Sequence, residues 1–438
     1  MAYKEVFRPQ DRPSLGHWIP LSFQHVFAMF GATILVPILT GLNPATALFT
    51  AGTGTLIYIL CTGAKVPAFL GSSFAFIPPL IAISANHGLP YALGGAVAAG
   101  IFYCLVGLII RFAGTKWLDI ALPPVVIGSV IVVIGLSLAP VAMGMAMNDA
   151  GGKYSLVFLS IAAVTLGVTI TANILLKGFF STIPILIGLV SGYLFTLIMG
   201  QFIPAYAIIN FQTVKDAPWF GLPVFQVPSF SLVPVLTFII VSLATICEHL
   251  GDTLVTSKVV GQDFYKNPGL HRTLTGDGLA TAWAAFWGGP PNTTYGENIG
   301  VMAITRVYSV WVIGGAAVIA VVLSLFRKFG ALIQTIPTPV LGGISMLLFG
   351  IIASSGLRTI VESGVDYKDK RNLTISSVIF VIGIGGGKLA FAFPVKEFLS
   401  NTPSYINFEL AGVALATVVG IILNLAIPKN QSRKQTAN

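Results

Sequence analysis

The chain has 438 residues, of which 55% are hydrophobic and only 9% are charged. Soluble globular proteins carry about 25% charged residues, so this composition excludes a soluble enzyme, a disordered chain and a fibrous protein. It indicates a polytopic membrane protein with the lipid bilayer as its partner. The net charge of +9 is explained by basic residues retained in cytoplasmic loops, and we expect no nucleic acid partner.

The three cysteines predict neither a disulfide framework nor a metal site. Cys61, Cys104 and Cys247 all lie in apolar runs and form no Cys-x-x-Cys motif. No His/Cys cluster has the spacing of metal ligands, so we expect no metal and no cofactor. The first 16 residues are polar and no short apolar core with a cleavage site follows them, so no cleaved signal peptide is expected.

Fourteen apolar stretches are candidates for membrane-spanning helices, which need about 20 mostly apolar residues. The third and the tenth are short for a span and have polar, Gly-rich flanks, and the connection 201–229 is expected on the membrane surface. In chain order the predicted segments are 18–40, 45–63, 71–85, 90–110, 119–142, 155–176, 179–200, 231–257, 271–288, 295–306, 308–327, 333–356, 372–387 and 408–427.

The basic residues predict the orientation of these segments. With a cytoplasmic N-terminus, 18 of the 24 Lys and Arg residues lie in inner loops and ends, and 6 lie outside. Cytoplasmic loops carry this excess in membrane proteins. Because fourteen crossings return the chain to its starting side, both termini are expected in the cytoplasm. Arg327 and Lys328 fall outside, so the rule does not support the boundary around 327–333.

The two halves of the chain show an internal repeat. Residues 31–35 align with 251–255 at an offset of 220, and residues 94–96 align with 314–316 at the same offset. Because each half holds seven segments, an odd number, the second half must enter the membrane from the opposite side, which makes an inverted repeat. We therefore expect two repeats, residues 14–200 and 228–427. A further match, at an offset of 215, pairs Pro124, Gly128 and Gly135 with Pro339, Gly343 and Gly350.

The two short segments, 71–85 and 295–306, occupy equivalent positions in the two repeats. A short, Gly-interrupted segment in each half of a secondary transporter is the best sequence pointer to a binding site near the membrane midplane. The start of each half-helix would place free backbone N–H groups and the positive end of a helix dipole inside the protein.

Three acidic residues, Glu248, Asp252 and Glu297, are predicted deep in the membrane, and Asp277 lies nearer the cytoplasmic end of its segment. No Lys or Arg is predicted at the centre of any segment. A carboxylate without a cationic partner in a medium of low dielectric constant tends to hold a proton, and such residues in membranes are functional candidates. Glu248 and Asp252 share a helix face, because they are four residues apart.

Structural roles remain open for these residues and their neighbours. Glu248 and Asp252 could form hydrogen bonds that only hold helices together, and Thr294 with Glu297 fits a capping box at the start of the tenth segment. Phe74 and Tyr295 lie beside the half-helix starts, where an aromatic ring either packs or stacks on a flat ligand. The histidines at 25 and 249 are expected to be hydrogen-bonded core residues.

Residues 297–306, with the sequence ENIGVMAITR, resemble the E/Q-N-x-G-x4-T-R signature of the nucleobase–ascorbate transporters, also called nucleobase:cation symporters. Gln24-His25, the run GSSFAF at 71–76 and the run PNTTYGE at 291–297 are similar to the bacterial uracil permease branch of that family. The resemblance covers about residues 14–427. The signature positions in this chain are Asn298, Gly300, Thr305 and Arg306.

The resemblance implies an all-α membrane protein of fourteen transmembrane segments in a 7+7 inverted repeat. Segments 1–4 and 8–11 would form a core domain, and segments 5–7 and 12–14 a gate domain. Short strands would precede the broken third and tenth segments. Members of the family are commonly homodimers and move their substrate together with protons.

The resemblance also implies roles for individual residues. Glu248 and Glu297 correspond to the carboxylates that bind uracil. Phe74, Tyr295 and Gly296 correspond to residues around the base, and Ala32 would line the same pocket. Proton coupling would involve Asp252 and Glu248, although some uracil permeases have His at the position of Asp252. Phe349 stands where a related uracil permease has Tyr, so no hydroxyl reaches the site from there.

These observations favour a proton-coupled uracil symporter that imports uracil across the cytoplasmic membrane by alternating access. The alternatives are a symporter for another nucleobase, a purine such as xanthine, and an anion exchanger on the same fold. Glu297 opposes the anion exchanger, since it would repel an anion. A channel is a further alternative. An enzyme is not expected, because the sequence holds no nucleophile–base set and no metal motif.

Overall fold

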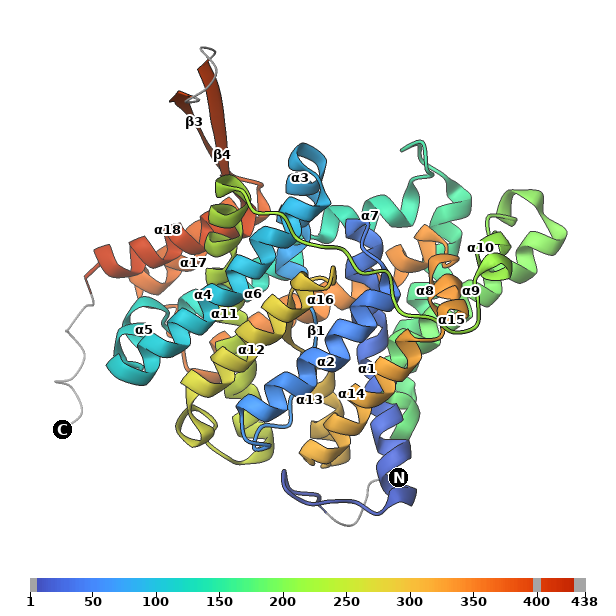
Figure 1. Cartoon of the computed structure of the whole chain (residues 1–438), viewed down its shortest axis with the longest axis horizontal. Helices are drawn as coiled ribbons and strands as arrows, with labels where there is room; N and C mark the ends of the chain where they lie inside the picture. The colour runs from blue at the N-terminus through green and yellow to red at the C-terminus, as the bar shows by residue number, and fades with distance from the viewer. Residues whose placement is uncertain (1–5, 397–402, 429–438) are drawn as a thin grey trace.

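The computed structural model describes residues 6–396 and 403–428, and these are mostly helical (Figure 1). The longer helices pack side by side, and one strand pair projects from the body. The α-helices are α1 (Leu15–Thr40), α2 (Pro44–Cys61), α3 (Ile77–His87), α4 (Leu89–Ala113), α5 (Lys116–Ala121), α6 (Pro124–Ser137), α7 (Ala139–Met147), α8 (Leu156–Leu175), α9 (Pro184–Phe202), α10 (Gln212–Asp216), α11 (Leu232–Val260), α12 (Leu270–Phe286), α13 (Gly296–Thr305), α14 (Val310–Ser324), α15 (Arg327–Gln334), α16 (Thr338–Glu362), α17 (Lys370–Ile384) and α18 (Gly412–Ala426). The strands are β1 (Leu70–Ser72), β2 (Asn292–Thr294), β3 (Lys388–Lys396) and β4 (Pro403–Ala411), and the short η turns are η1 (Phe74–Phe76), η2 (Gly178–Thr182), η3 (Pro204–Tyr206) and η4 (Tyr265–Gly269).

Within the described residues, eight helical stretches are long and apolar enough to cross a membrane. They are α1, α2, α4, α6 together with α7, α8, α9, α11 and α16. Three shorter apolar helices, Phe74–His87, α14 and α18, lie between them. Multiple apolar helices packed in one body confirm the prediction of a multi-pass membrane protein.

Several predicted segment boundaries are wrong, among them the twelfth, predicted at 333–356 and observed as α16 at Thr338–Glu362. Two others have a local reason. The fifth segment was expected from 119, but residues up to Ala121 form the separate helix α5, and α6 begins only at Pro124, where proline suits a first turn. The eleventh was expected to reach 327, but α14 ends at Ser324 and Arg327 begins α15. This separate helix explains why basic residues occur there.

The chain also forms a β-hairpin that the prediction missed. Strands β3 and β4 pair antiparallel, with Lys388 opposite Ala411, and they project beyond the helices (Figure 1). The predicted fourteenth segment began at 408, but α18 starts only at Gly412. The run KLAFAF from Lys388 is apolar after its lysine, and a short apolar run does not by periodicity distinguish a strand from a helix.

A much shorter strand pair lies in the middle of the protein and joins the two halves of the chain. Strand β1 pairs antiparallel with β2, with Leu70 opposite Thr294 and Ser72 opposite Asn292. The backbone N–H of Tyr295 extends the ladder by donating to the carbonyl of Phe69 at 3.0 Å. Each strand leads directly into a short helix: β1 into η1 and α3, and β2 into α13.

Small residues let the helices around this pair approach closely. Helices α4 and α12 meet along Gly100 and Gly278, whose Cα positions face each other's backbones. A Cβ at Gly278 would lie 2.6 Å from the carbonyl oxygen of Gly100. Since lipid tails are as apolar as leucine, helices in membranes associate through such close van der Waals packing. The sequence of α12 continues into β2, so this packing supports the central strand pair.

We predict that Gly100→Ala destabilises the protein, because the new Cβ would lie 2.5 Å from the carbonyl oxygen of Gly278. Overpacking of this kind costs about 1–3 kcal/mol and should lower the apparent melting temperature in detergent. The matched control is Gly167→Ala in α8, where a Cβ meets nothing within 4 Å. Equal melting temperatures for the two variants would contradict the close packing of α4 on α12.

Candidate binding site between the broken helices

The predicted site residues meet around the β1–β2 pair. Glu248 and Asp252 lie on α11, and Glu297 lies in the first turn of α13 directly after β2. Phe74 lies in η1 directly after β1. The strand pairing therefore brings together residues that are more than 200 positions apart in the sequence.

Two threonines of the β2 segment hold the carboxylates of α11. The Thr294 hydroxyl donates to Asp252 Oδ2 at 2.8 Å, and the Thr293 hydroxyl lies 3.5 Å from Glu248 Oε2. Both carboxylates are buried, with 8% and 9% of the residue exposed. Neither they nor Glu297 belong to an ion pair within the described residues. The two carboxylates of α11 thus meet neutral hydroxyl groups, without a cation.

The N-terminus of α13 faces open space. Tyr295 is the N-cap residue of this helix and its side chain makes no capping hydrogen bond. Gly296, the first helical residue, is exposed, and a Cβ built on it would meet no atom within 4 Å. The capping box that the sequence left open does not form, because the Thr294 hydroxyl is directed to Asp252. The first N–H groups of α13 are therefore left for a ligand carbonyl or water.

Aromatic rings close two sides of this space. Phe74 and Phe349 of α16 are buried and meet edge to face, with ring centroids 5.6 Å apart. Tyr295 is also buried, and its hydroxyl donates to the carbonyl of Ser72 at 3.2 Å and accepts from the Thr33 hydroxyl at 3.2 Å. Its ring lies against Gly71, where any Cβ would collide with it.

Ala32 precedes Thr33 in α1 and is completely buried. Because Thr33 contacts Tyr295, this stretch of α1 packs beside the site. The sequence prediction had singled out Ala32 but missed Thr33 and the two threonines of β2. The run of two threonines directly before the signature was the available signal, since hydroxyl groups are the usual neutral partners of buried carboxylates.

The signature residues of α13 make contacts that position and end this helix. The Asn298 amide donates to the backbone carbonyl of His25 at 3.2 Å and lies 3.0 Å from Nδ1 of the same residue, which joins α13 to α1. A Cβ at Gly300 meets nothing within 4 Å. The Thr305 hydroxyl donates to the carbonyl of Val301 at 2.8 Å. Arg306 has a φ of 59° and ends the helix in the left-handed region.

A third buried acid, Asp277, forms a separate pair. Asp277 of α12 lies 2.8 Å from Nδ1 of His249 on α11, and both side chains are fully buried. The other imidazole nitrogen lies 3.1 Å from the Thr273 hydroxyl. The expectation that His249 is a hydrogen-bonded core residue is confirmed. The pair fixes α12 to α11 one residue away from Glu248.

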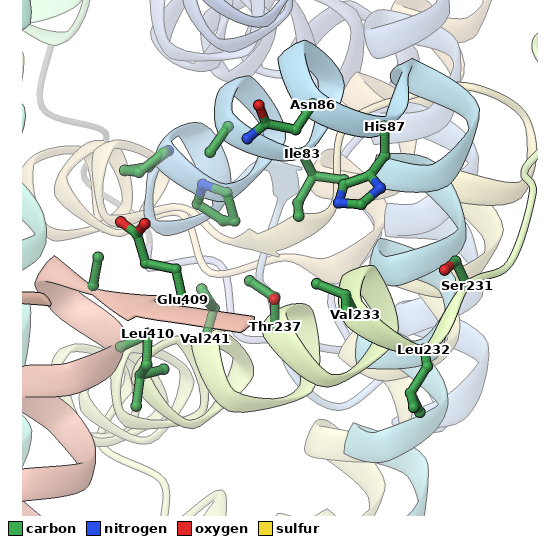
Figure 2. A pocket seen from close by; sticks show the side chains of 15 residues that line it. Ile83, Asn86, His87, Ser231, Leu232, Val233, Thr237, Val241, Glu409 and Leu410 are labelled. Atoms are coloured by element: carbon green, nitrogen blue, oxygen red, sulfur yellow. The ribbon is translucent and has the colours of Figure 1, made fainter. Parts of the chain in front are cut away.

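Two neighbouring cavities lie beside the broken helix α3. A cavity of about 700 Å³ separates α3 from α11 and ends at β4. Figure 2 shows Asn86 and His87 of α3 above Val233 and Thr237 of α11, with Glu409 of β4 at one side. A neighbouring cavity of about 360 Å³ shares Pro78 and Pro79 with the first and continues to Ala75. Ala75 is the residue after Phe74, so these two cavities lead towards the site.

Broken helices whose starts meet in the middle of a body of apolar helices define a secondary transporter of the membrane. Solved structures share this fold. The transmembrane domain of the cyanobacterial bicarbonate transporter BicA matches with a TM-score of 0.60 at 16% identity, over 82% of this chain and 98% of that one. The structure of SLC26A9 matches with a TM-score of 0.65 at 11% identity, over 94% of this chain and 66% of that one.

The sequence comparisons define the family. The model of a permease family (Xan_ur_permease) matches residues 16–390. The uracil permease of Bacillus caldolyticus is 51% identical over 432 residues, or 97% of this chain and 95% of the relative. That of Bacillus subtilis is 51% identical over 98% and 96%, and that of Escherichia coli K12 is 46% identical over 95% and 92%.

The chain therefore belongs to the nucleobase–ascorbate transporter family. The resemblance carried by residues 297–306 is confirmed. Because this family consists of permeases, the expectation that the protein is a transporter and not an enzyme is confirmed as well.

Proposed function

We propose that the protein is a uracil–proton symporter that imports uracil across the cytoplasmic membrane. The observation that carries the proposal is the placement of Glu248 and Glu297 beside the uncapped N-terminus of α13, in a chain similar along its whole length to proteins named uracil permeases. The names of the relatives indicate the substrate, and the site has groups whose chemistry matches uracil.

The chemistry of uracil suits these groups. The base is neutral and flat, with two N–H donors and two carbonyl acceptors. Carboxylates of Glu248 and Glu297 accept from the N–H groups, and the free backbone N–H groups at Gly296 donate to a carbonyl. The apolar ring of Phe74 supplies a stacking surface, while Tyr295, whose hydroxyl already contacts Thr33 and Ser72, shapes the wall beside it.

We propose further that fourteen segments cross the membrane as two inverted repeats of seven. The antiparallel pairing of β1 with β2 supports this arrangement, since the two strands precede the equivalent broken helices α3 and α13. The core domain comprises segments 1–4 and 8–11, and the gate domain segments 5–7 and 12–14. A homodimer joined outside the substrate site completes the proposed assembly.

Contacts between the two proposed domains support alternating access. At the site, Phe74 of the core domain meets Phe349 of the gate domain. Towards the proposed cytoplasmic side, the Gln24 amide donates to the Thr182 hydroxyl at 2.9 Å. Lys258 and Glu362 form an ion pair of 3.2 Å between the ends of α11 and α16. On the opposite side, the cavity of Figure 2 lies between α3 and α11 of the proposed core domain and is bordered by β4 and the start of α18 from the proposed gate domain. Uracil would enter there and leave after these inner contacts separate.

The proposed orientation places α5 inside and the α7–α8 connection outside. The chain termini, which are predicted to be cytoplasmic, belong to residues 1–5 and 429–438 and lie outside the described residues. We predict that a cysteine at Lys116→Cys reacts only with a membrane-permeant reagent in intact cells, while Lys153→Cys also reacts with an impermeant one. Both are made in a chain whose Cys61, Cys104 and Cys247 are alanine. The reverse pattern would overturn the orientation.

An anion exchanger is the second candidate, because the matched structure of BicA is named a bicarbonate transporter. The likeness of fold does not extend to the site. An anion bound at the start of α13 would lie beside Glu297, and no Lys or Arg pairs with this carboxylate among the described residues. A neutral substrate avoids this repulsion.

The proposed function predicts saturable uptake of labelled uracil into proteoliposomes that an inward proton gradient accelerates. Excess unlabelled xanthine or hypoxanthine should barely compete, while 5-fluorouracil should compete well, because buried polar groups left unpaired reject a wrong ligand strongly. Liposomes without protein and a protonophore are the controls. Equal competition by a purine would overturn the assignment of uracil as the substrate, but not the assignment to the family. An uptake rate that does not depend on the proton gradient would refute proton coupling.

We predict that Glu248→Gln and Glu297→Gln each weaken uracil binding. Glutamine keeps the shape of the side chain but places a donor against a ligand N–H, which costs on the order of 2–4 kcal/mol, or tens- to a thousandfold in affinity. Calorimetric titration of the purified variants measures the loss. Glu409→Gln, in the outer cavity, is the matched control and should bind as the wild type does. Wild-type affinity in a folded Glu297→Gln variant would remove this residue from the site.

We predict that Asp252 acts mainly in proton coupling. Asp252 lies one turn from Glu248 and is held by the Thr294 hydroxyl, which leaves it beside the base-binding carboxylate without a cation. Asp252→Asn should lose accumulation driven by a pH gradient more severely than it loses uracil binding. The control is Asp216→Asn at the end of α10, in an exposed helix. Accumulation with unchanged pH dependence would assign the proton to another group, and Glu248 is the next candidate.

A further inference from the structure

A hollow on the flank of the helix bundle has no part in the proposed transport path. It has a volume of about 680 Å³ and lies between the end of α2, the second half of α4 and the start of α12. Its lining combines three basic residues with an apolar wall. The residues that line it are Cys61, Ile101, Cys104, Leu105, Gly107, Leu108, Arg111, His271, Arg272 and Thr275.

The basic residues of this hollow lack acidic partners. Arg111, His271 and Arg272 line it together, no Asp or Glu lines it, and none of the three belongs to an ion pair in the part of the chain that the structure describes. Nearby lysines are already engaged: Lys65 donates to Asn267 Oδ1 at 2.7 Å, and Lys266 pairs with an aspartate. The guanidinium groups of Arg111 and Arg272 around one space repel each other until an anion enters.

The start of α12 adds to the positive potential. This helix of 17 residues begins at Leu270, directly before His271, and its N-cap Gly269 has no side chain to cap it. The N–H of Leu270 already donates to the carbonyl of Tyr265, so the helix favours a bound anion through the positive end of its dipole. The hollow therefore attracts negative charge through both side chains and backbone.

The wall of the hollow is apolar and faces outwards. Ile101, Leu105 and Leu108 follow one another at helical spacing along one face of α4. They are 52%, 52% and 49% exposed. On a membrane-spanning helix such a face meets lipid chains. The wall runs along α4 from the basic residues towards the middle of the helix, since Arg111 lies near its end.

We infer that this hollow binds an anionic phospholipid, with the phosphate between Arg111 and Arg272 and an acyl chain along the α4 wall. Basic pockets between membrane helices bind lipid headgroups in this way. A free phosphate would use the basic residues but gain nothing from the wall, which is why the lipid is the occupant. The inference requires only that α4 and α12 lie in a membrane; the proposed orientation assigns the lipid to the cytoplasmic leaflet.

The bound lipid would fix the position of helices α4 and α12 in the bilayer. Helix α12 packs closely on α4 through Gly100 and Gly278 and leads into β2, which carries the threonines that contact the carboxylates. A lipid anchored at the start of α12 thus fixes the position of this helix pair in the bilayer without touching the substrate.

The test compares lipid binding to wild type and to Arg111→Gln/Arg272→Gln by native mass spectrometry with phosphatidylglycerol and phosphatidylcholine. The matched control Lys177→Gln/Lys368→Gln removes the same charge from exposed positions of other connections. We expect the wild type and the control to retain phosphatidylglycerol preferentially, and the arginine variant to bind it about tenfold more weakly. Equal binding by all three proteins would overturn the proposal.

A second measurement locates the lipid in the purified protein. Cys61 and Cys104 line the hollow, while Cys247 is fully buried elsewhere. In the wild type, phosphatidylglycerol should slow alkylation of Cys61 and Cys104 by N-ethylmaleimide, and inorganic phosphate should not. The arginine variant should lose this protection while keeping the melting temperature of the wild type in neutral detergent. Protection by phosphate alone would show an ion site without a lipid, and undiminished protection in the variant would place the lipid elsewhere.

Discussion

The pairing of β1 with β2 is the interaction on which the rest of the structure depends. A helix that breaks inside a membrane leaves backbone N–H and C=O groups unpaired, and each unsatisfied group costs several kcal/mol where water is absent. The two breaks satisfy each other, because Leu70–Ser72 pairs antiparallel with Asn292–Thr294. The pairing leaves two half-helices starting near the centre of the body, and it aligns segments from the two ends of the chain.

The site is built from what this pairing brings together. Thr293 and Thr294 project to the carboxylates of α11, Tyr295 turns its ring against Gly71, and Gly296 begins α13 in open space. Four consecutive residues thus supply hydroxyl donors, an aromatic wall and free backbone donors. None of them carries a charge, so the acids of the site are surrounded by neutral dipoles. Neutral surroundings suit a neutral base, the substrate class of the proposed function.

The two sides of the protein are built differently around this centre. On one side, the cavity of Figure 2 separates α3 from α11 and reaches Ala75. On the other, polar contacts such as Lys258 with Glu362 join helices of the proposed core and gate domains. The flank of α4 and α12 is different again, since Arg111 and Arg272 stand there without acidic partners. The proposed transport path and the proposed lipid site therefore lie on separate surfaces of the protein.

The sequence by itself determined the membrane class, the approximate ranges of the apolar helices and the family. Membrane class follows from composition, because lipid requires long apolar runs, and the family follows from the local run at 297–306. The buried acids Glu248 and Asp252 could also be named in advance, since charge inside a membrane is costly and therefore functional. Local composition did not predict the separate helix α15, where charged residues adjoin an apolar run, or the β3–β4 hairpin, where an apolar run forms a strand.

Only the tertiary structure decided which groups meet. The sequence allowed Thr294 to cap α13, but the fold directs its hydroxyl to Asp252, because strand β2 lies against α11. It also decided that His249 pairs with Asp277 and that Phe74 faces Phe349. Such contacts join residues from distant segments, and their geometry depends on how whole helices pack. The pattern of residues along the chain determines which groups are available, and packing in space determines their partners.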